Sequence, residues 1–149
     1  MKRIYVNEKW CLGCRLCEYY CAFAGIDGEN GDNEDMARAL KDIKINPRIK
    51  IEEYDGISFA VSCRHCKEPL CVKSCITGAL SIADGVIKIN REKCVGCYTC
   101  ILVCPFGAVS PSDGGAVQKC ELCVNKTPGN PACVRGCPNG AIVFEERGL

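Results

Sequence analysis

The stretch that decides the fold runs from residue 94 to residue 105 and reads Cys94-Val95-Gly96-Cys97-Tyr98-Thr99-Cys100-Ile101-Leu102-Val103-Cys104-Pro105. Its cysteines follow the spacing C-x2-C-x2-C-x3-C, and a proline comes directly after the last one. Two-residue spacers let a tight loop present three thiolates to three corners of one cubane. Gly96 allows the backbone to approach it closely, and Pro105 ends the turn that carries the fourth cysteine. This spacing is typical of a [4Fe–4S] site, and its fourth cysteine normally ligates a second cluster.

The other cysteines form three further groups of four, so that none of the sixteen is left over. The first group has the same spacing as the third, whereas the second reads C-x2-C-x4-C-x3-C and the fourth reads C-x2-C-x9-C-x3-C. Each group can therefore give three ligands to one cluster and one to another. In chain order the groups are Cys11, Cys14, Cys17 and Cys21; Cys63, Cys66, Cys71 and Cys75; Cys94, Cys97, Cys100 and Cys104; and Cys120, Cys123, Cys133 and Cys137.

Zinc and disulfides are the alternatives to iron. Paired C-x2-C motifs also bind zinc, and the pair Cys120 and Cys123 alone fits either metal. A third cysteine two residues after such a pair is unusual for a zinc knuckle, which favours iron–sulfur clusters. The first nine residues contain no apolar segment or cleavage site of an export signal, so we expect a cytoplasmic protein. Thiols stay reduced in the cytoplasm, which disfavours a disulfide framework.

The charge and the hydropathy exclude other classes of function. The formal net charge of the 149 residues is +1, and four thiolate-bound clusters would bring it to about −7, which argues against a nucleic-acid partner. The longest largely apolar stretch, 100–109, has about half the length that spans a bilayer, so we expect no membrane insertion. No nucleophile–base pair and no phosphate-binding loop can be assembled, so we do not expect the chain itself to be an enzyme.

The flanks of the cysteine groups repeat, as in a duplicated unit of strand, ligand loop, short helix and strand. We expect a strand at 4–7, and hairpins that turn at Asp55-Gly56, Asp84-Gly85 and Asp113-Gly114-Gly115. Short helices are expected at 16–22, 70–74, 98–103 and 132–136. The segment 27–55 lacks cysteine and is acidic, and Asn33 is a candidate N-cap for a helix that runs to Lys41. This insertion is either a solvated surface element or a docking element for a partner subunit.

The whole layout resembles the four-cluster ferredoxin-like electron-transfer subunits. These accompany carbon monoxide dehydrogenase, tungsten or molybdenum aldehyde oxidoreductase, hydrogenase, formate dehydrogenase and dimethyl sulfoxide reductase. The resemblance rests on the order of the four groups, on Cys63-Arg64-His65-Cys66 with Pro69-Leu70-Cys71, and on Cys104-Pro105-Phe106-Gly107. It implies an α+β fold of two dicluster lobes with pseudo-two-fold symmetry. One lobe would comprise 1–26 and 112–149, the other 57–111, and 27–56 would be the acidic insertion.

The resemblance also implies how the cysteine groups share four [4Fe–4S] clusters, because group one pairs with group four and group two with group three in that family. The implied sets are Cys11, Cys14, Cys17 and Cys137; Cys21, Cys120, Cys123 and Cys133; Cys63, Cys66, Cys71 and Cys104; and Cys75, Cys94, Cys97 and Cys100. The implied role is a relay of single electrons in a hetero-oligomer, between a larger catalytic metalloenzyme subunit and a second electron carrier or flavoprotein. A free polyferredoxin without a dedicated partner is the alternative, and a zinc-binding structural module is a remote one.

Six other residues lie next to or among the cysteines. His65, the only histidine, is expected to make a hydrogen bond near the ligands rather than to replace a thiolate. Aromatic residues next to ligands are expected to shield clusters from water, and basic residues around the fourth group are expected to be solvated surface charges. The aromatic residues are Trp10 and Tyr98, and the basic ones are Lys119, Lys126 and Arg135.

Overall fold

Short antiparallel strand pairs and short helices make up the fold, which is α+β. The computed structural model of the chain describes residues 1–25 and 45–147. The elements in chain order are β1 (Arg3–Val6), η1 (Glu8–Trp10), α1 (Leu16–Gly25), β2 (Lys50–Tyr54), β3 (Ile57–Val61), α3 (Leu70–Lys73), β4 (Leu80–Ala83), β5 (Val86–Ile89), α4 (Thr99–Leu102), β6 (Val109–Pro111), β7 (Val117–Lys119), α5 (Ala132–Arg135) and β8 (Ile142–Glu145).

The hairpin predictions are confirmed. In the β2–β3 pair Tyr54 faces Ile57, and in the β4–β5 pair Ala83 faces Val86, so each turn contains two residues. Both turns are Asp-Gly with positive φ at both positions, between 49° and 75°. This is the type I′ geometry, whose twist matches that of the flanking strands. The third hairpin pairs β6 with β7 around the predicted Asp-Gly-Gly turn.

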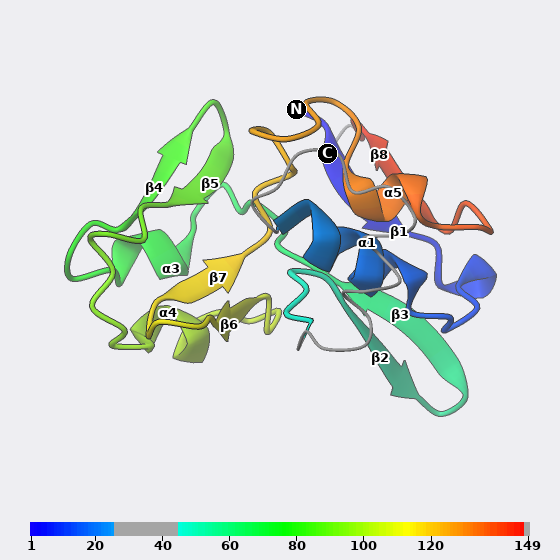
Figure 1. Cartoon of the computed structure of the whole chain (residues 1–149), viewed down its shortest axis with the longest axis horizontal. Coiled ribbons are helices and arrows are strands. Elements are labelled where there is room, and N and C mark those ends of the chain that lie inside the picture. The colour runs from blue at the N-terminus through cyan, green and yellow to red at the C-terminus, as the bar shows by residue number, and fades with distance from the viewer. Residues whose placement is uncertain (26–44, 148–149) are drawn as a thin grey trace.

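The two ends of the chain meet in one sheet. β1 pairs with β8, and Ile4 lies opposite Phe144 in the register. The first and last strands thereby close the part of the molecule that also contains α1, α5 and the β2–β3 hairpin, while α3, α4 and the other two hairpins form the second part (Figure 1). Within the first part β3 contacts η1 and β2 contacts α1.

In the described part of the chain, each of α1, α3, α4 and α5 holds one cysteine near its start, and a second cysteine follows four residues later. The second cysteine is still within α1, but it lies just beyond the end of α3, α4 and α5. The prolines Pro69 and Pro131 stand at the N-caps of α3 and α5, where a missing N–H costs no helical hydrogen bond. The helices contact one another in pairs, α1 with α5 and α3 with α4. The four predicted helices are confirmed, and α1 extends three residues further than expected. The predicted helix from Asn33 to Lys41 lies outside the described residues.

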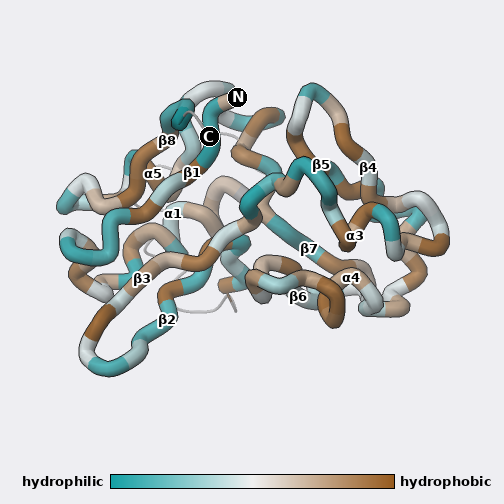
Figure 2. Tube along the Cα trace, turned by 180° about the vertical axis from the view of Figure 1, so that it is seen from behind, coloured by the Kyte–Doolittle hydropathy of each residue, from teal (hydrophilic) through white to brown (hydrophobic). Residues whose placement is uncertain are grey.

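Cysteines are part of both hydrophobic cores. One core packs Ile4, Ile49, Ile51 and Ile142 against buried cysteines of the first part, and the other packs Leu80, Ile87, Val109 and Val117 around cysteines of the second part. Hydrophobic stretches run through both parts, for example near α3 and α4 (Figure 2). Among the described residues, no helix is long and apolar enough to cross a membrane.

Candidate metal centres

Site 1 is a cavity beside the first ligand loop. Its cysteines are Cys11 and Cys14 from the loop after η1, Cys17 from α1, and Cys137, which follows α5. They line an empty volume of about 310 Å³ together with Trp10. Cys17 is buried and Cys14 is exposed, so one side of this cavity faces solvent. The packing of α5 on α1 brings a cysteine from the end of the sequence to three from its beginning.

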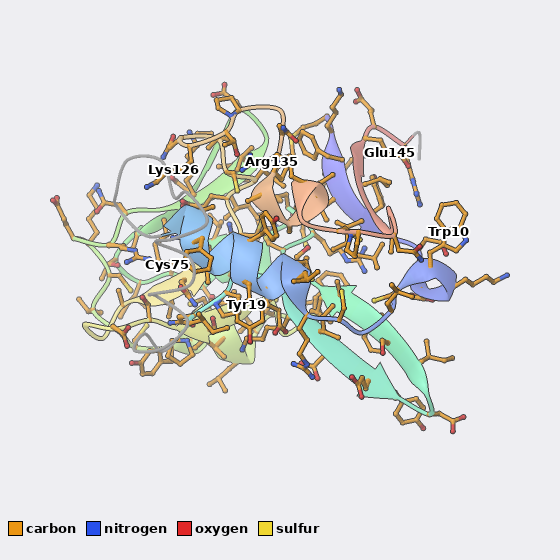
Figure 3. All side chains as sticks on the ribbon, turned by 45° about the vertical axis from the view of Figure 1, so that its right-hand side comes forward. Trp10, Tyr19, Cys75, Lys126, Arg135 and Glu145 are labelled. Carbon is orange, nitrogen blue, oxygen red and sulfur yellow. The ribbon has the colours of Figure 1, made fainter. Side chains whose placement is uncertain are left out.

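Site 4 is the corresponding cavity in the second part of the molecule. Cys94, Cys97 and Cys100 come from the stretch that decides the fold, and Cys75 comes from the turn after α3. These cysteines line an empty volume of about 330 Å³ together with Tyr98. Cys97 is exposed, Cys100 is buried, and the other two are half-buried. Trp10 and Cys75, which mark sites 1 and 4, lie on opposite sides of the molecule (Figure 3).

Site 2 lies deeper, next to site 1. Cys21, one helical turn after Cys17 on α1, lies among three cysteines of the fourth group. Burial raises the pKa of the Cys133 thiol, and the charges of Cys21, Cys120 and Cys123 raise it further. Burial also raises the pKa of Cys120 to about 12. Such thiols stay protonated until iron displaces the proton, so metal binding and proton release are coupled here.

Site 3 is formed by cysteines of groups two and three. Burial raises the pKa of Cys71 to about 11, and the charges of Cys63 and Cys104 contribute to this increase. Burial likewise raises the pKa of Cys63, whose neighbours include Cys104 and Cys66. The charge of Cys63 also raises the pKa of the Cys120 thiol. Sites 2 and 3 are therefore neighbours across the junction of the two parts.

The cysteine sulfurs receive hydrogen bonds from the backbone. The N–H of Arg48 donates to Cys21 Sγ at 3.2 Å, and the N–H groups of Ala108 and Leu122 donate to Cys104 and Cys120, each at 3.4 Å. Such donors stabilise thiolates and influence the potential of an iron–sulfur cluster. Sites 1 and 4 thus each place four cysteines around one cavity, and sites 2 and 3 receive these N–H donors at sulfur. Four thiolates and backbone N–H donors are the groups that suit a [4Fe–4S] cluster.

Gly96 is needed in the third ligand loop for two reasons. Its φ is +67°, in the left-handed region that favours glycine. A Cβ at this position would also overlap the carbonyl oxygen of Gly115. The close approach that Gly96 permits here is to the β6–β7 turn. The expected approach of its backbone to a cluster stays a prediction.

Lys119 corrects one expectation from the sequence. It was predicted to be a solvated surface charge, but only 1% of it is exposed. Its Nζ donates to the backbone carbonyl oxygens of Ile87 and Cys120, the second at 2.6 Å. The other basic residues near the fourth group, Lys126 and Arg135, are exposed.

His65 lies between Cys63 and Cys66 in the sequence and is buried, with 1% exposed. Its Nδ1 accepts the N–H of Ile87 at 3.0 Å, so this nitrogen carries no proton and the ring is neutral. This hydrogen bond is to the backbone of β5 and not to a cysteine, so the expected contact of His65 with the cluster ligands stays a prediction. The two aromatic residues Trp10 and Tyr98 line sites 1 and 4, but 55% of Trp10 and 40% of Tyr98 are exposed, so they shield these sites only partly.

Comparison with known proteins identifies the family. A family model described as a 4Fe-4S dicluster domain matches residues 54–147. The chain belongs to this family. A second model, a 4Fe-4S binding domain, matches residues 8–24, which contain the first cysteine group. As a member of this ferredoxin-like electron-transfer family, the chain binds [4Fe–4S] clusters, and its sixteen cysteines suffice for four of them.

Named relatives point the same way. The iron-sulfur protein of Rhodospirillum rubrum is 36% identical over 93% of this chain and 79% of its own length. The electron transport protein HydN of Escherichia coli K12 is 33% identical over 97% of this chain and 87% of its own length. Hydrogenase-4 component A of the same strain is 29% identical over 95% of this chain and 82% of its own length. The chain also spans 21% of the much longer E. coli protein AegA.

Proposed function

We propose that this chain is a non-catalytic relay subunit whose cysteines hold one [4Fe–4S] cluster at each of sites 1 to 4. When bound, each cluster supplies one-electron redox chemistry. The ligand sets are the sixteen cysteines in the four combinations given above for the sites. Sites 1 and 2 share α1 and α5, sites 3 and 4 share α3 and α4, and Cys63 and Cys120 connect the two halves. The proposed order is therefore 1–2–3–4.

The change in exposure along this series is the observation that carries the proposal. Cys14 at site 1 and Cys97 at site 4 are exposed, whereas Cys63, Cys120 and Cys133 in the middle are buried. Burial of the inner sites excludes water and competing acceptors. The exposed ends allow a redox partner at each end of the chain of sites.

The partners we propose are a catalytic subunit of the hydrogenase, carbon monoxide dehydrogenase or aldehyde oxidoreductase type at one end, and a second carrier or flavoprotein at the other. The relative named hydrogenase-4 component A supports a partner of the first kind. We also propose a cytoplasmic location, where thiols stay reduced. We further propose that the chain has two pseudo-symmetric lobes. One lobe comprises 1–26 and 112–149, the other comprises 57–111, and 27–56 is the insertion. The two helix pairs support this division.

Electron transfer from a native enzyme tests the relay role. An anaerobic extract of the native source is separated into fractions, and each fraction is supplied in turn with hydrogen, carbon monoxide or an aldehyde. The cluster-loaded chain is added as the only electron acceptor. We expect one substrate to bleach the visible absorbance of the clusters in one fraction, and a large metalloenzyme in that fraction to co-purify with the chain. Equal bleaching in all fractions without a bound enzyme would instead support the free polyferredoxin.

A further inference from the structure

Lys119 is a buried cation between two candidate cluster sites. It ends β7 and directly precedes Cys120 of site 2, and only 1% of it is exposed. An ammonium group has three donors, and two of these reach the carbonyl oxygens of Ile87 and Cys120. Among the residues that the structure describes, the third donor has no acceptor and no carboxylate forms an ion pair with this group.

Such a charge requires compensation. Moving an ammonium out of water costs several kcal/mol unless an opposite charge lies nearby. His65 beside it is neutral and supplies none. The compensating charge must therefore come from the cysteine sites, since a thiolate-bound cluster is anionic.

Lys119 lies at the junction of sites 2 and 3. It directly precedes Cys120 of site 2, and its Nζ donates to the carbonyl oxygen of Ile87. The N–H of the same Ile87 donates to His65, which lies in the sequence between two cysteines of site 3. Burial raises the pKa of the Cys63 thiol, and the Lys119 ammonium is the strongest influence that lowers it again. The same ammonium opposes the raised pKa of Cys71 in site 3 and of Cys120 in site 2. No other lysine acts on these three thiols, as far as the described residues extend.

We propose that Lys119 is the shared counter-cation of sites 2 and 3, and that its ammonium raises the reduction potentials of both clusters relative to sites 1 and 4. Reduction adds one electron and no proton at each site, so the fixed positive charge favours the reduced form. The effect is strong because the charge is buried, where water does not screen it. The inference rests on cluster ligation at these two sites, but it requires no redox partner.

The test is a potentiometric titration of the loaded protein, followed by electron paramagnetic resonance. Lys119→Met removes the charge and keeps the length of the side chain, and Lys119→Arg keeps the charge. We expect two of the four clusters in K119M to become harder to reduce, with at least a tenfold change in the ratio of oxidised to reduced cluster at a fixed potential, or about 59 mV. The other two clusters should shift less, and K119R should stay close to the parent.

The matched control is Lys73→Gln. Lys73 lies between Cys71 and Cys75, but 59% of its side chain is exposed and it pairs with Glu68. The same loss of charge should therefore shift the potentials less than in K119M. Unchanged potentials in fully loaded K119M, or an equal shift of all four clusters, would overturn the proposal.

If K119M does not retain its iron, its potentials cannot be measured, and the iron content and the potentials of K119R decide between the two explanations. If K119R then loads fully and keeps the parental potentials, the charge is what matters and the proposal stands. If K119R loses iron to the same extent as K119M, Lys119 is a packing residue and the proposal fails. These measurements use the isolated chain, so a failure of the relay role does not affect them.

Discussion

Glu121 Oε1 accepts a hydrogen bond of 2.7 Å from the backbone N–H of Ile89. Glu121 lies between two cysteines of the fourth group, and Ile89 ends β5 in the second part of the molecule. Two residues earlier on β5, the N–H of Ile87 donates to His65 and its carbonyl oxygen accepts from Lys119. Three side chains therefore satisfy the edge of β5 that does not pair with β4, and they join the two inner sites.

Removing this carboxylate should weaken the junction. Glu121→Ala leaves the half-buried Ile89 N–H without its acceptor, which costs about 1 kcal/mol, below the penalty for a fully buried group. We expect E121A to release its clusters at a lower guanidinium concentration than the parent, measured anaerobically by the loss of visible absorbance. Glu121→Gln keeps an acceptor oxygen and should lie between the two.

Glu92→Ala is the control for this experiment, because Glu92 is exposed and precedes the third cysteine group. It should leave the midpoint of cluster release unchanged. A midpoint for E121A that equals that of E92A would show that the contact with Ile89 contributes nothing.

Gly96→Ala should damage site 4 specifically. The new Cβ meets the carbonyl oxygen of Gly115, and the left-handed backbone adds a cost of about 1–2 kcal/mol. Gly107→Ala is a matched control, since its φ is +59° but its Cβ has nothing within 4 Å. We expect G96A to lower the iron content of the protein more than G107A does. Equal iron contents would mean that the overlap is relieved without consequence.

Single Cys→Ser variants test how the groups share their ligands. If Cys137 belongs to site 1, Cys137→Ser should perturb the same paramagnetic signal as Cys14→Ser, although the two residues are far apart in sequence. Cys21→Ser should perturb the signal that Cys123→Ser perturbs. A Cys137→Ser variant that instead shares its altered signal with Cys123→Ser would contradict the assignment and imply that each group holds its own cluster.

The sequence predicted local structure well, because local chemistry determines it. Asp84-Gly85 and Asp55-Gly56 favour one turn geometry, and both hairpins have the predicted positions. The burial of Lys119 was not predicted, because it depends on the contact of β7 with β5, which are far apart in sequence. The role of Glu121 was missed for the same reason, since its partner is a backbone N–H and leaves no trace in the residue types.

Metal and sulfide analysis of the anaerobically purified chain tests the central claim most directly. Sixteen thiolates that hold four cubanes predict about sixteen iron and about sixteen acid-labile sulfide per chain, with broad visible absorbance that bleaches on reduction. About four zinc per chain, without sulfide and without visible absorbance, would contradict the account.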